Sequence, residues 1–230
     1  MTFPTVESIT ESPFATATTE HLCDFPATVN AGDLLILIAA NDNATAQTTP
    51  SGWDVLDKRS PNNQVYGGIY ALDAAGTEGG GTVDVVTAAA EEMSAHMYRI
   101  IGWKGSIATD VDISTFAESA TGSDAPDPNS VTAGGGSDDN LFIAAVVSGD
   151  DDESAQTYPT NYGNGVSVSS GSTTASAKPR SHSCRRELAA ASDNPGAWLL
   201  TGAEQWLAWT IVIAPAVSGA GLEILRRRRN

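Results

Sequence analysis

Apolar runs bounded by turn-forming residues recur along the chain at the lengths of β-strands. The segment 34–40, LLILIAA, is apolar at every position and follows the turn sequence Ala31-Gly32-Asp33. Such a run predicts a central strand that is covered on both faces. Other segments alternate apolar and polar residues or are rich in Val, Ile, Tyr and Thr, which favours strands. We expect these strands at 14–26, 53–60, 65–73, 82–88, 94–103 and 140–148.

The second half of the chain repeats the pattern of the first. Both PATVNAGDLLILIAA (26–40) and PNSVTAGGGSDDNLFIAAVV (128–147) read Pro, two residues, Val, one residue, Ala-Gly, an acidic turn and an apolar run. Further on, Pro159 and Tyr162 take the positions that Pro50 and Trp53 have in the first half. The quasi-repeats span about residues 14–115 and 128–217.

Each half supplies about five strands, which are marginal unless a second sheet covers their apolar face. Two such sets packed face to face predict an all-β fold, a β-sandwich of jelly-roll type built from two sequence-similar halves, with residues 1–218 as one domain. The alternative is two small sandwiches joined near 115–135, a polar segment rich in Gly, Pro and Asp. Central strands that are apolar on both faces favour the single sandwich.

The charge of the chain is strongly negative but unevenly spread. The formal net charge is −16 and the isoelectric point is about 4.3, while hydrophobic residues make up 41% of the chain, enough for a core. An acidic surface repels nucleic acid, so we expect no nucleic-acid partner. A basic arm, 219–230, follows the predicted sandwich and contains Arg226, Arg227, Arg228 and Arg229.

Arginine pairs well with carboxylates, so the arm is predicted to bind an acidic surface of another subunit. The alternative is that it folds back on its own acidic body. A second basic patch, KPRSHSCRRE, contains Arg185 and Arg186, which we expect to contact protein, and we expect a homo-oligomer. In that case the patch meets the acidic run Asp150–Glu153 of a neighbouring copy.

The chain starts without a basic, apolar signal-peptide pattern, and no segment has the roughly 18 apolar residues that a membrane span needs. We therefore expect synthesis in a host cytoplasm and no membrane partner. Cys23 and Cys184 are too few for a disulfide framework. We expect small residues on strands, with a single bridge as the alternative.

Chemistry-bearing motifs are few. His21, His96 and His182 form no metal-binding pair, and no G-x-S-x-G elbow is present, so we expect neither an enzyme nor a cofactor. Asp150, Asp151 and Asp152 form a weak calcium candidate, and a solvated loop is the alternative. Trp53, Trp206 and Trp209 are candidates for stacking on sugar rings. Because Trp206 and Trp209 are an odd number of positions apart, they should face opposite sides of a strand. We expect one of them to pack inward and the other to face a partner or solvent.

Several segments together resemble a loose group of phage and bacterial β-sandwich modules found in virion-decoration, tail-fibre and surface proteins. The resemblance covers residues 15–217 and rests on AGDLLILIAANDN, PSGWDVL, VYGGIYALDAAGTEGGG, SAHMYRIIGW and the closing WLAWTIVIAPA. It implies a structural role in a virion, as a capsid decoration or cement protein or a head or tail fibre component that attaches to other virion subunits. It supplies no catalytic residues. The alternative function is a carbohydrate- or receptor-binding module that contacts host-surface glycan through exposed tryptophans.

Overall fold

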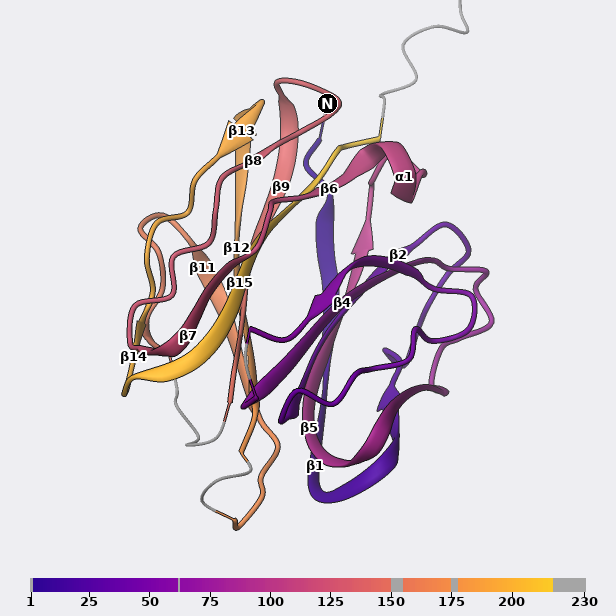
Figure 1. Ribbon diagram of the computed structural model, residues 1–230. Coiled ribbons are helices and arrows are strands. Elements are labelled where there is room, and N and C mark those ends of the chain that lie inside the picture. The colour runs from indigo at the N-terminus through magenta and orange to yellow at the C-terminus, as the bar shows by residue number, and fades with distance from the viewer. Residues whose placement is uncertain (1, 62, 150–154, 175–177, 217–230) are drawn as a thin grey trace, which may run out of the picture.

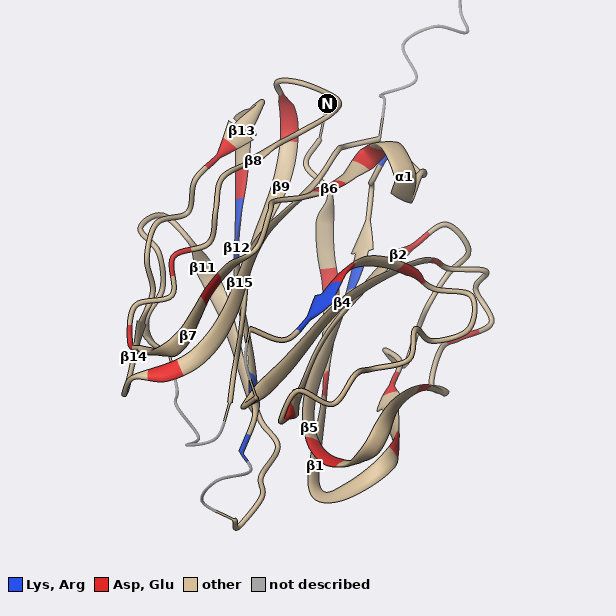
Figure 2. Cartoon of the chain, in the orientation of Figure 1, with Lys and Arg blue, Asp and Glu red and all other residues tan. Residues whose placement is uncertain are grey.

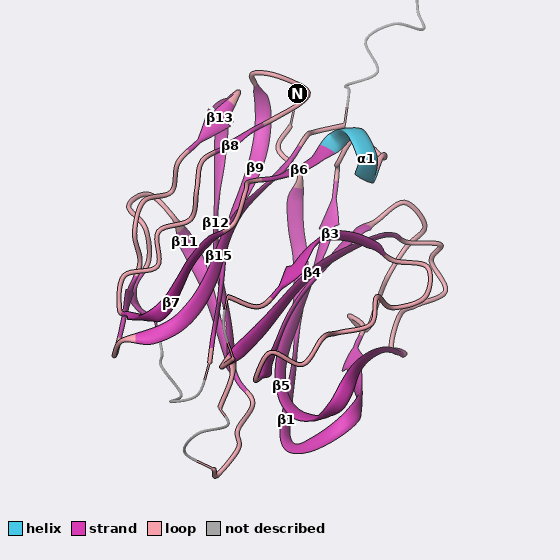
Figure 3. Ribbon diagram, viewed as in Figure 1, coloured by secondary structure: helices cyan, strands magenta, loops and turns pink. Residues whose placement is uncertain are grey.

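The structure, a computed structural model, describes residues 2–61, 63–149, 155–174 and 178–216. These residues form an all-β sandwich of two large antiparallel sheets, as expected (Figure 1). The described part of the chain has a single short helix, α1 (Ile107–Asp110), which Figure 3 shows at one end of the sandwich.

The first large sheet consists of strands from the first half of the chain, in the order β1-β5-β2-β4-β3. Figure 1 shows it in indigo to magenta beside the second sheet, whose strands run from magenta and pink through orange to yellow. Its strands are β1 (Thr5–Asp24), β2 (Leu34–Asp42), β3 (Asp54–Arg59), β4 (Val65–Asp73) and β5 (Thr82–Ile101).

The second large sheet has the order β11-β12-β9-β15-β6, and β7 also pairs with β15. Two small sheets, β8 with β13 and β10 with β14, flank it. The strands of the second half are β6 (Val111–Ile113), β7 (Ala117–Ser123), β8 (Val131–Thr132), β9 (Asp138–Ser148), β10 (Ala155–Thr157), β11 (Gly163–Ser169), β12 (Arg180–Ala190), β13 (Ser192–Asp193), β14 (Leu199–Leu200) and β15 (Glu204–Ile213).

When the second large sheet is read from β6, its order is β6-β15-β9-β12-β11. The strands then follow one another across the sheet in the same relative chain order as β1-β5-β2-β4-β3 of the first sheet. Registers agree as well, since Leu34 pairs with Ile100 in the first sheet and Leu141 pairs with Ile213 in the second. Each sheet comes from one contiguous half of the chain, so the strand order gives no support to the jelly-roll part of the expectation.

The same turn precedes an aromatic residue in both halves. The Trp53 amide donates to the Pro50 carbonyl over 3.2 Å, and the Tyr162 amide donates to the Pro159 carbonyl over 3.0 Å. The residue before each aromatic, Gly52 or Asn161, has a positive φ, which Gly and Asn tolerate best.

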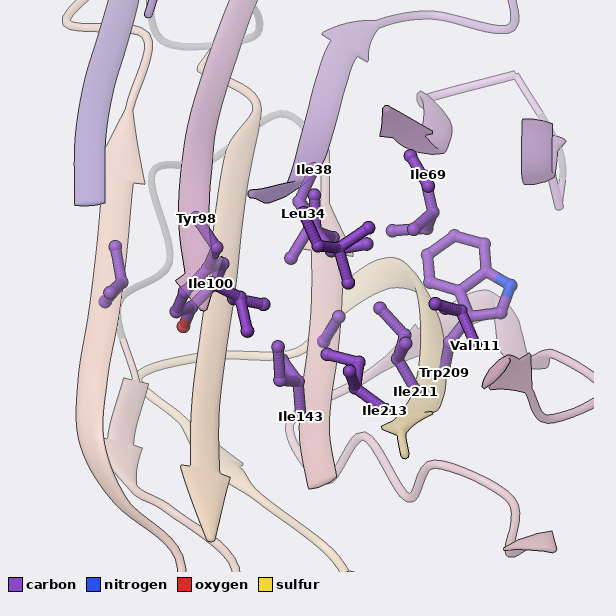
Figure 4. Packing of buried hydrophobic residues seen from close by; sticks show 14 of the residues in the cluster. Leu34, Ile38, Ile69, Tyr98, Ile100, Val111, Ile143, Trp209, Ile211 and Ile213 are labelled. Atoms are coloured by element: carbon purple, nitrogen blue, oxygen red, sulfur yellow. The ribbon is translucent and has the colours of Figure 1, made fainter. Parts of the chain in front are cut away.

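The core fills the space between the sheets. Alternate residues of the central strands point into it, and Figure 4 shows side chains of both sheets converging, among them Ile38 and Tyr98 from the first and Ile143 and Trp209 from the second. Both central strands are buried on their outer faces too. In β2 the odd-numbered residues, among them Leu35 and Leu37, lie on the outer face and belong to a second buried cluster. The prediction that this strand is covered on both sides is therefore confirmed.

Two element boundaries differ from the sequence prediction. The separate strands expected at 82–88 and 94–103 are one strand, β5, because the intervening residues AAEEM contain neither Gly nor Pro to end it. Its partner β1 starts at Thr5, and the register between the two strands shifts between Val6 and Ser8 and again between Phe14 and Glu20.

Candidate functional site: an arginine pocket between the sheets

Strand β12 places its two adjacent arginines on opposite faces of the second sheet. It pairs antiparallel with β9, with Arg185 opposite Ile143 and Arg186 opposite Phe142. Ile143 belongs to the cluster between the sheets, whereas Phe142 belongs to the outer cluster of the second sheet. Arg185 therefore faces the first sheet, and Arg186 faces outward.

A pocket of about 270 Å³ opens at the seam where β12 approaches β1 of the first sheet. It combines apolar side chains with two cationic side chains, one amide and the carboxylate of Glu187. The lining residues are Val6, Leu141, Asn164, Arg185, Arg186 and Glu187.

Arg185 has no carboxylate partner among the residues that the structure describes. Its side chain is partly buried, and its Nη1 atom is buried without a hydrogen-bond acceptor. The guanidinium carbon lies 5.9 Å from the centroid of the Tyr98 ring, within the range of a cation–π contact. The ring supplies only part of the stabilisation that a cation loses when it leaves water.

Arg186, by contrast, is already paired within the chain. Its Nη1 lies 3.3 Å from Asp193 Oδ1, and its guanidinium carbon lies 5.6 Å from the centroid of the Tyr162 ring. Tyr162 also donates a hydrogen bond of 2.6 Å to Asp193. The basic patch predicted from the sequence is thus divided into one paired arginine and one unpaired arginine.

A fully buried polar cluster lies behind the pocket, where the two sheets face each other. The ring nitrogens of His96 on β5 lie 2.9 Å from Ser181 Oγ and 2.7 Å from Ser183 Oγ on β12. The Tyr98 hydroxyl is also 2.7 Å from Ser183 Oγ. Burial lowers the pKa of His96 to about 3 and raises the pKa of Tyr98 to about 12, so both are neutral near pH 7.

The Ser183–His96 pair has the distance of a nucleophile and its base. Both side chains are completely buried, however, and neither lines the pocket in front of them. The pair joins the two sheets and presents no surface to a substrate.

The other histidines are also buried in the sheets. Both ring nitrogens of His21 face backbone carbonyls, of Val85 at 3.0 Å and Glu91 at 2.9 Å. His182 Nε2 lies 3.4 Å from Ser148 Oγ. Within the described ranges, no three His, Cys, Asp or Glu side chains are arranged to hold a metal ion.

The cysteines are buried and unbonded, so the alternative of a disulfide is not realised. Cys23 lies on β1 and Cys184 on β12. Burial raises the pKa of both thiols, which keeps them protonated.

The candidate stacking tryptophans have little exposed surface. Trp209 packs between the sheets and Trp206 packs on the outer face, so the prediction of opposite faces is confirmed. The expectation that one of them faces solvent or a partner is wrong, because the segments around Tyr162 and Trp198 cover the outer face of the second sheet. Trp53 is 8% exposed and borders a separate groove of about 390 Å³ with Phe25, Glu78 and Asp84.

Two predicted sites lie outside the described residues. These are the calcium candidate Asp150, Asp151 and Asp152 and the arm residues Arg226, Arg227, Arg228 and Arg229. In the described part, Figure 2 shows basic positions on β12 among many acidic ones.

Sequence analysis identified Arg185 but missed the buried cluster behind it. The sequence around it, SHSCRR, places Ser181 and Ser183 on the same face as Arg185, at positions where β4 of the first sheet has apolar residues. Polar residues at alternate positions, in a segment that corresponds to a strand of the first half, were the available signal.

In comparisons with known proteins, no family model, no curated protein and no solved structure matches the chain. No helix in the described ranges is long and apolar enough to cross a bilayer.

Proposed function

We propose that the chain is a non-catalytic structural subunit, and that its Arg185 pocket binds a carboxylate-bearing segment of a neighbouring subunit. The observation that carries this proposal is an arginine without a carboxylate partner, half-buried in a pocket of a protein whose net charge is −16. Acidic residues outnumber basic ones by 28 to 12, so the lack of a carboxylate beside Arg185 does not come from a shortage of carboxylates in the chain.

A partner's carboxylate would remove the cost of the unpaired cation. Arginine binds carboxylates through two parallel hydrogen bonds, and it stabilises interfaces strongly where water is excluded. Val6 and Leu141 line the same pocket with apolar side chains, and Arg185 is itself partly buried. A charge pair in this position stabilises the complex more than one on the open surface.

The acidic run Asp150–Glu153 of a second copy has the required chemistry. In its own chain the run follows Gly149, at the opposite end of β9 from Leu141. Arg185 lies opposite Ile143, and the five steps from Ile143 to Ser148 span about 17 Å at 3.3 Å per residue. We infer that the pairing occurs between copies, as a head-to-tail contact that builds rings or longer assemblies.

The resemblance to virion-decoration and fibre modules suggests where such an assembly belongs. We propose a capsid decoration or cement protein, or a component of a head or tail fibre. Two further features suit a structural role: the extensive core between the sheets, and a Ser–His pair that is sealed inside that core.

A charge-swap experiment tests the pairing. One variant carries Arg185→Glu, and a second carries Asp151→Arg and Asp152→Arg in the acidic run. Each variant alone should associate at least tenfold more weakly than the wild type, and an equimolar mixture of the two should regain association, measured by sedimentation velocity. Lys104→Glu is the matched control, because it makes the same change of charge at a well-exposed side chain outside the pocket.

If the mixture associates no better than either variant alone, the acidic run is not the partner. If Arg185→Glu and Lys104→Glu weaken association equally, overall charge rather than the pocket is responsible. A folded monomeric wild type at all concentrations would contradict self-association.

The groove beside Trp53 supports a second candidate function, binding of a carbohydrate. An aromatic pair, Phe25 and Trp53, stacks there with ring centroids 6.2 Å apart, and the groove also contains the carboxylates of Glu78 and Asp84. Aromatic faces with flanking carboxylates are suited to sugar rings and their hydroxyls. Ser51→Trp would fill this groove without removing a core side chain, so glycan binding that this variant abolishes would favour the second function.

A further inference from the structure

A second open groove, of about 390 Å³, lies on the side of the sandwich where strands β3 and β6 form the sheet edges. Both halves of the chain contribute apolar side chains to it, and the lining includes two carboxylates, one from each half. The lining residues are Asp54, Val55, Leu56, Ile107, Ala108, Val111, Asp112 and Ile113. Figure 3 shows α1, which carries Ile107 and Ala108, beside β6 on the side of β3.

This groove has the features of a surface that is normally covered. Val55 is one of the few large apolar residues of the described chain that are well exposed, at 41%. Strand β3 is the last strand of its sheet and pairs only with β4 among the described strands, so its outer backbone groups are available for pairing. An edge strand with exposed apolar residues promotes association unless something covers it.

The groove is also acidic at its rim. Asp54 is exposed and has no ion-pair or hydrogen-bond partner in the described ranges. Asp112 accepts a hydrogen bond of 2.7 Å from the Gly134 amide, which leaves its second oxygen for another donor. The complementary ligand is an extended segment with apolar residues followed or preceded by cations.

The described chain ends beside this groove. The Ala216 amide donates to the Gly102 carbonyl over 2.7 Å, and the Ala214 amide donates to the carbonyl of Asp110 over 2.9 Å. Asp110 is the last residue of α1, and Val111 and Asp112 follow it in the groove lining. The described part of the chain therefore ends next to the helix that lines the groove.

The sequence of that remainder matches the groove in chemistry. After Ala216 come five small residues, VSGAG, which span at most about 18 Å. Leu222, Ile224 and Leu225 then supply apolar side chains, and Arg226–Arg229 supply four cations.

We propose that the groove between β3 and α1–β6 binds residues 222–229 of the same chain, with the leucine and isoleucine side chains on the apolar base and the arginines at Asp54 and Asp112. The arm then covers the free edge of β3 and prevents uncontrolled pairing between copies. This inference goes beyond the proposed function and does not depend on it, because the Arg185 pocket lies at the opposite edges of the sheets, by β1 and β11.

The test compares full-length chains by hydrogen exchange and by trypsin cleavage. One variant changes the groove, Val55→Ser with Asp54→Lys, and another changes the arm, Leu222→Ser, Ile224→Ser and Leu225→Ser. In both variants we expect backbone amides of β3 to exchange at least fivefold faster than in the wild type, and trypsin to cleave within 226–229 at least fivefold faster. Leu22→Ser is the control, since Leu22 is exposed and distant from the groove in the sheet order.

Unchanged exchange and cleavage in the groove variant would overturn the proposal. So would faster exchange that appears equally in Leu22→Ser. If the protection of β3 in the wild type rises with protein concentration, the groove is occupied by the arm of a second copy, and the assignment to the same chain is wrong. Loss of association in Arg185→Glu with intact protection of β3 would separate the two proposals.

Discussion

His96 Nε2 lies 2.7 Å from Ser183 Oγ, in a hydrogen bond that joins the first sheet to the second in the middle of the core. His96 comes from β5 in one half of the chain and Ser183 from β12 in the other. Both residues are completely buried, so a change in the protonation of the ring affects the contact between the halves directly.

Acid should destabilise the fold through His96. Its folded-state pKa of about 3 is below the ordinary value of 6.5, because burial disfavours the charged ring and His182 lies nearby. Between these two pH values the unfolded chain binds a proton that the folded chain does not. The stabilisation is complete above pH 6.5 and decreases toward pH 3, by up to about 1.4 kcal/mol per pH unit.

Urea unfolding at several pH values measures this slope. His96→Gln retains a donor and an acceptor but does not titrate, so its free energy of unfolding should depend less on pH than that of the wild type. Carboxylates contribute to both proteins and cancel in the difference. Equal slopes between pH 4 and pH 6.5 would contradict the assignment.

Removing the Ser183 hydroxyl should leave both His96 and Tyr98 short of a partner. We expect Ser183→Ala to lower the free energy of unfolding by about 1–3 kcal/mol, the cost of a buried polar group without its hydrogen bond. Ser192→Ala, on the short exposed strand β13, is the comparison and should change stability by less than about 0.5 kcal/mol. Chemical denaturation of the two variants provides the measurement, and equal effects would argue against the cluster.

Gly67 allows the sheets to approach each other. A Cβ atom at this position would lie 2.6 Å from Val147 Cγ2 and 2.8 Å from the Trp209 ring, both in the facing sheet. Gly67→Ala should therefore destabilise the fold by about 1–3 kcal/mol. Gly163→Ala introduces a methyl group with no neighbour within 4 Å and should be close to neutral in the same thermal-unfolding experiment.

The second link between the halves is a hydrogen bond of 2.8 Å from Trp209 Nε1 to Asp57 Oδ2. Asp57 also accepts hydrogen bonds from Arg59, whose guanidinium stacks 3.8 Å from the Phe116 ring centroid. A double-mutant cycle with Asp57→Ala and Trp209→Phe should give a coupling free energy of about 0.5–3 kcal/mol. Additive effects would show that the two side chains do not interact in solution.

The pattern of apolar residues was sufficient to predict the sandwich, most strands of the first sheet and the placement of Trp206 and Trp209 on opposite faces of one strand. Each of these depends on local alternation and on the need to cover an apolar face. The sequence also identified Arg185, because two adjacent arginines are conspicuous in so acidic a chain.

What the sequence could not provide depends on contacts between distant residues. The residues next to Arg185 in the sequence do not show that Arg186 pairs with Asp193 while Arg185 has no carboxylate partner. This difference arises because the two arginines lie on opposite faces of β12 and because the turn after β12 brings Asp193 to one of these faces. The burial of Trp206 depends on how the segments around Tyr162 and Trp198 fold over the outer face. The polar cluster of His96, Tyr98, Ser181 and Ser183 forms only when the two sheets meet.

The most direct test of the assembly proposal is sedimentation equilibrium of the wild type, Arg185→Gln and Lys104→Gln over a wide range of concentrations. Truncation of one partner in a close charge pair weakens an interface by an order of magnitude or more. We predict that the wild type and Lys104→Gln associate with similar constants and that Arg185→Gln associates at least tenfold more weakly. Equal association constants for all three proteins, or a wild type that stays monomeric throughout, would contradict the proposal.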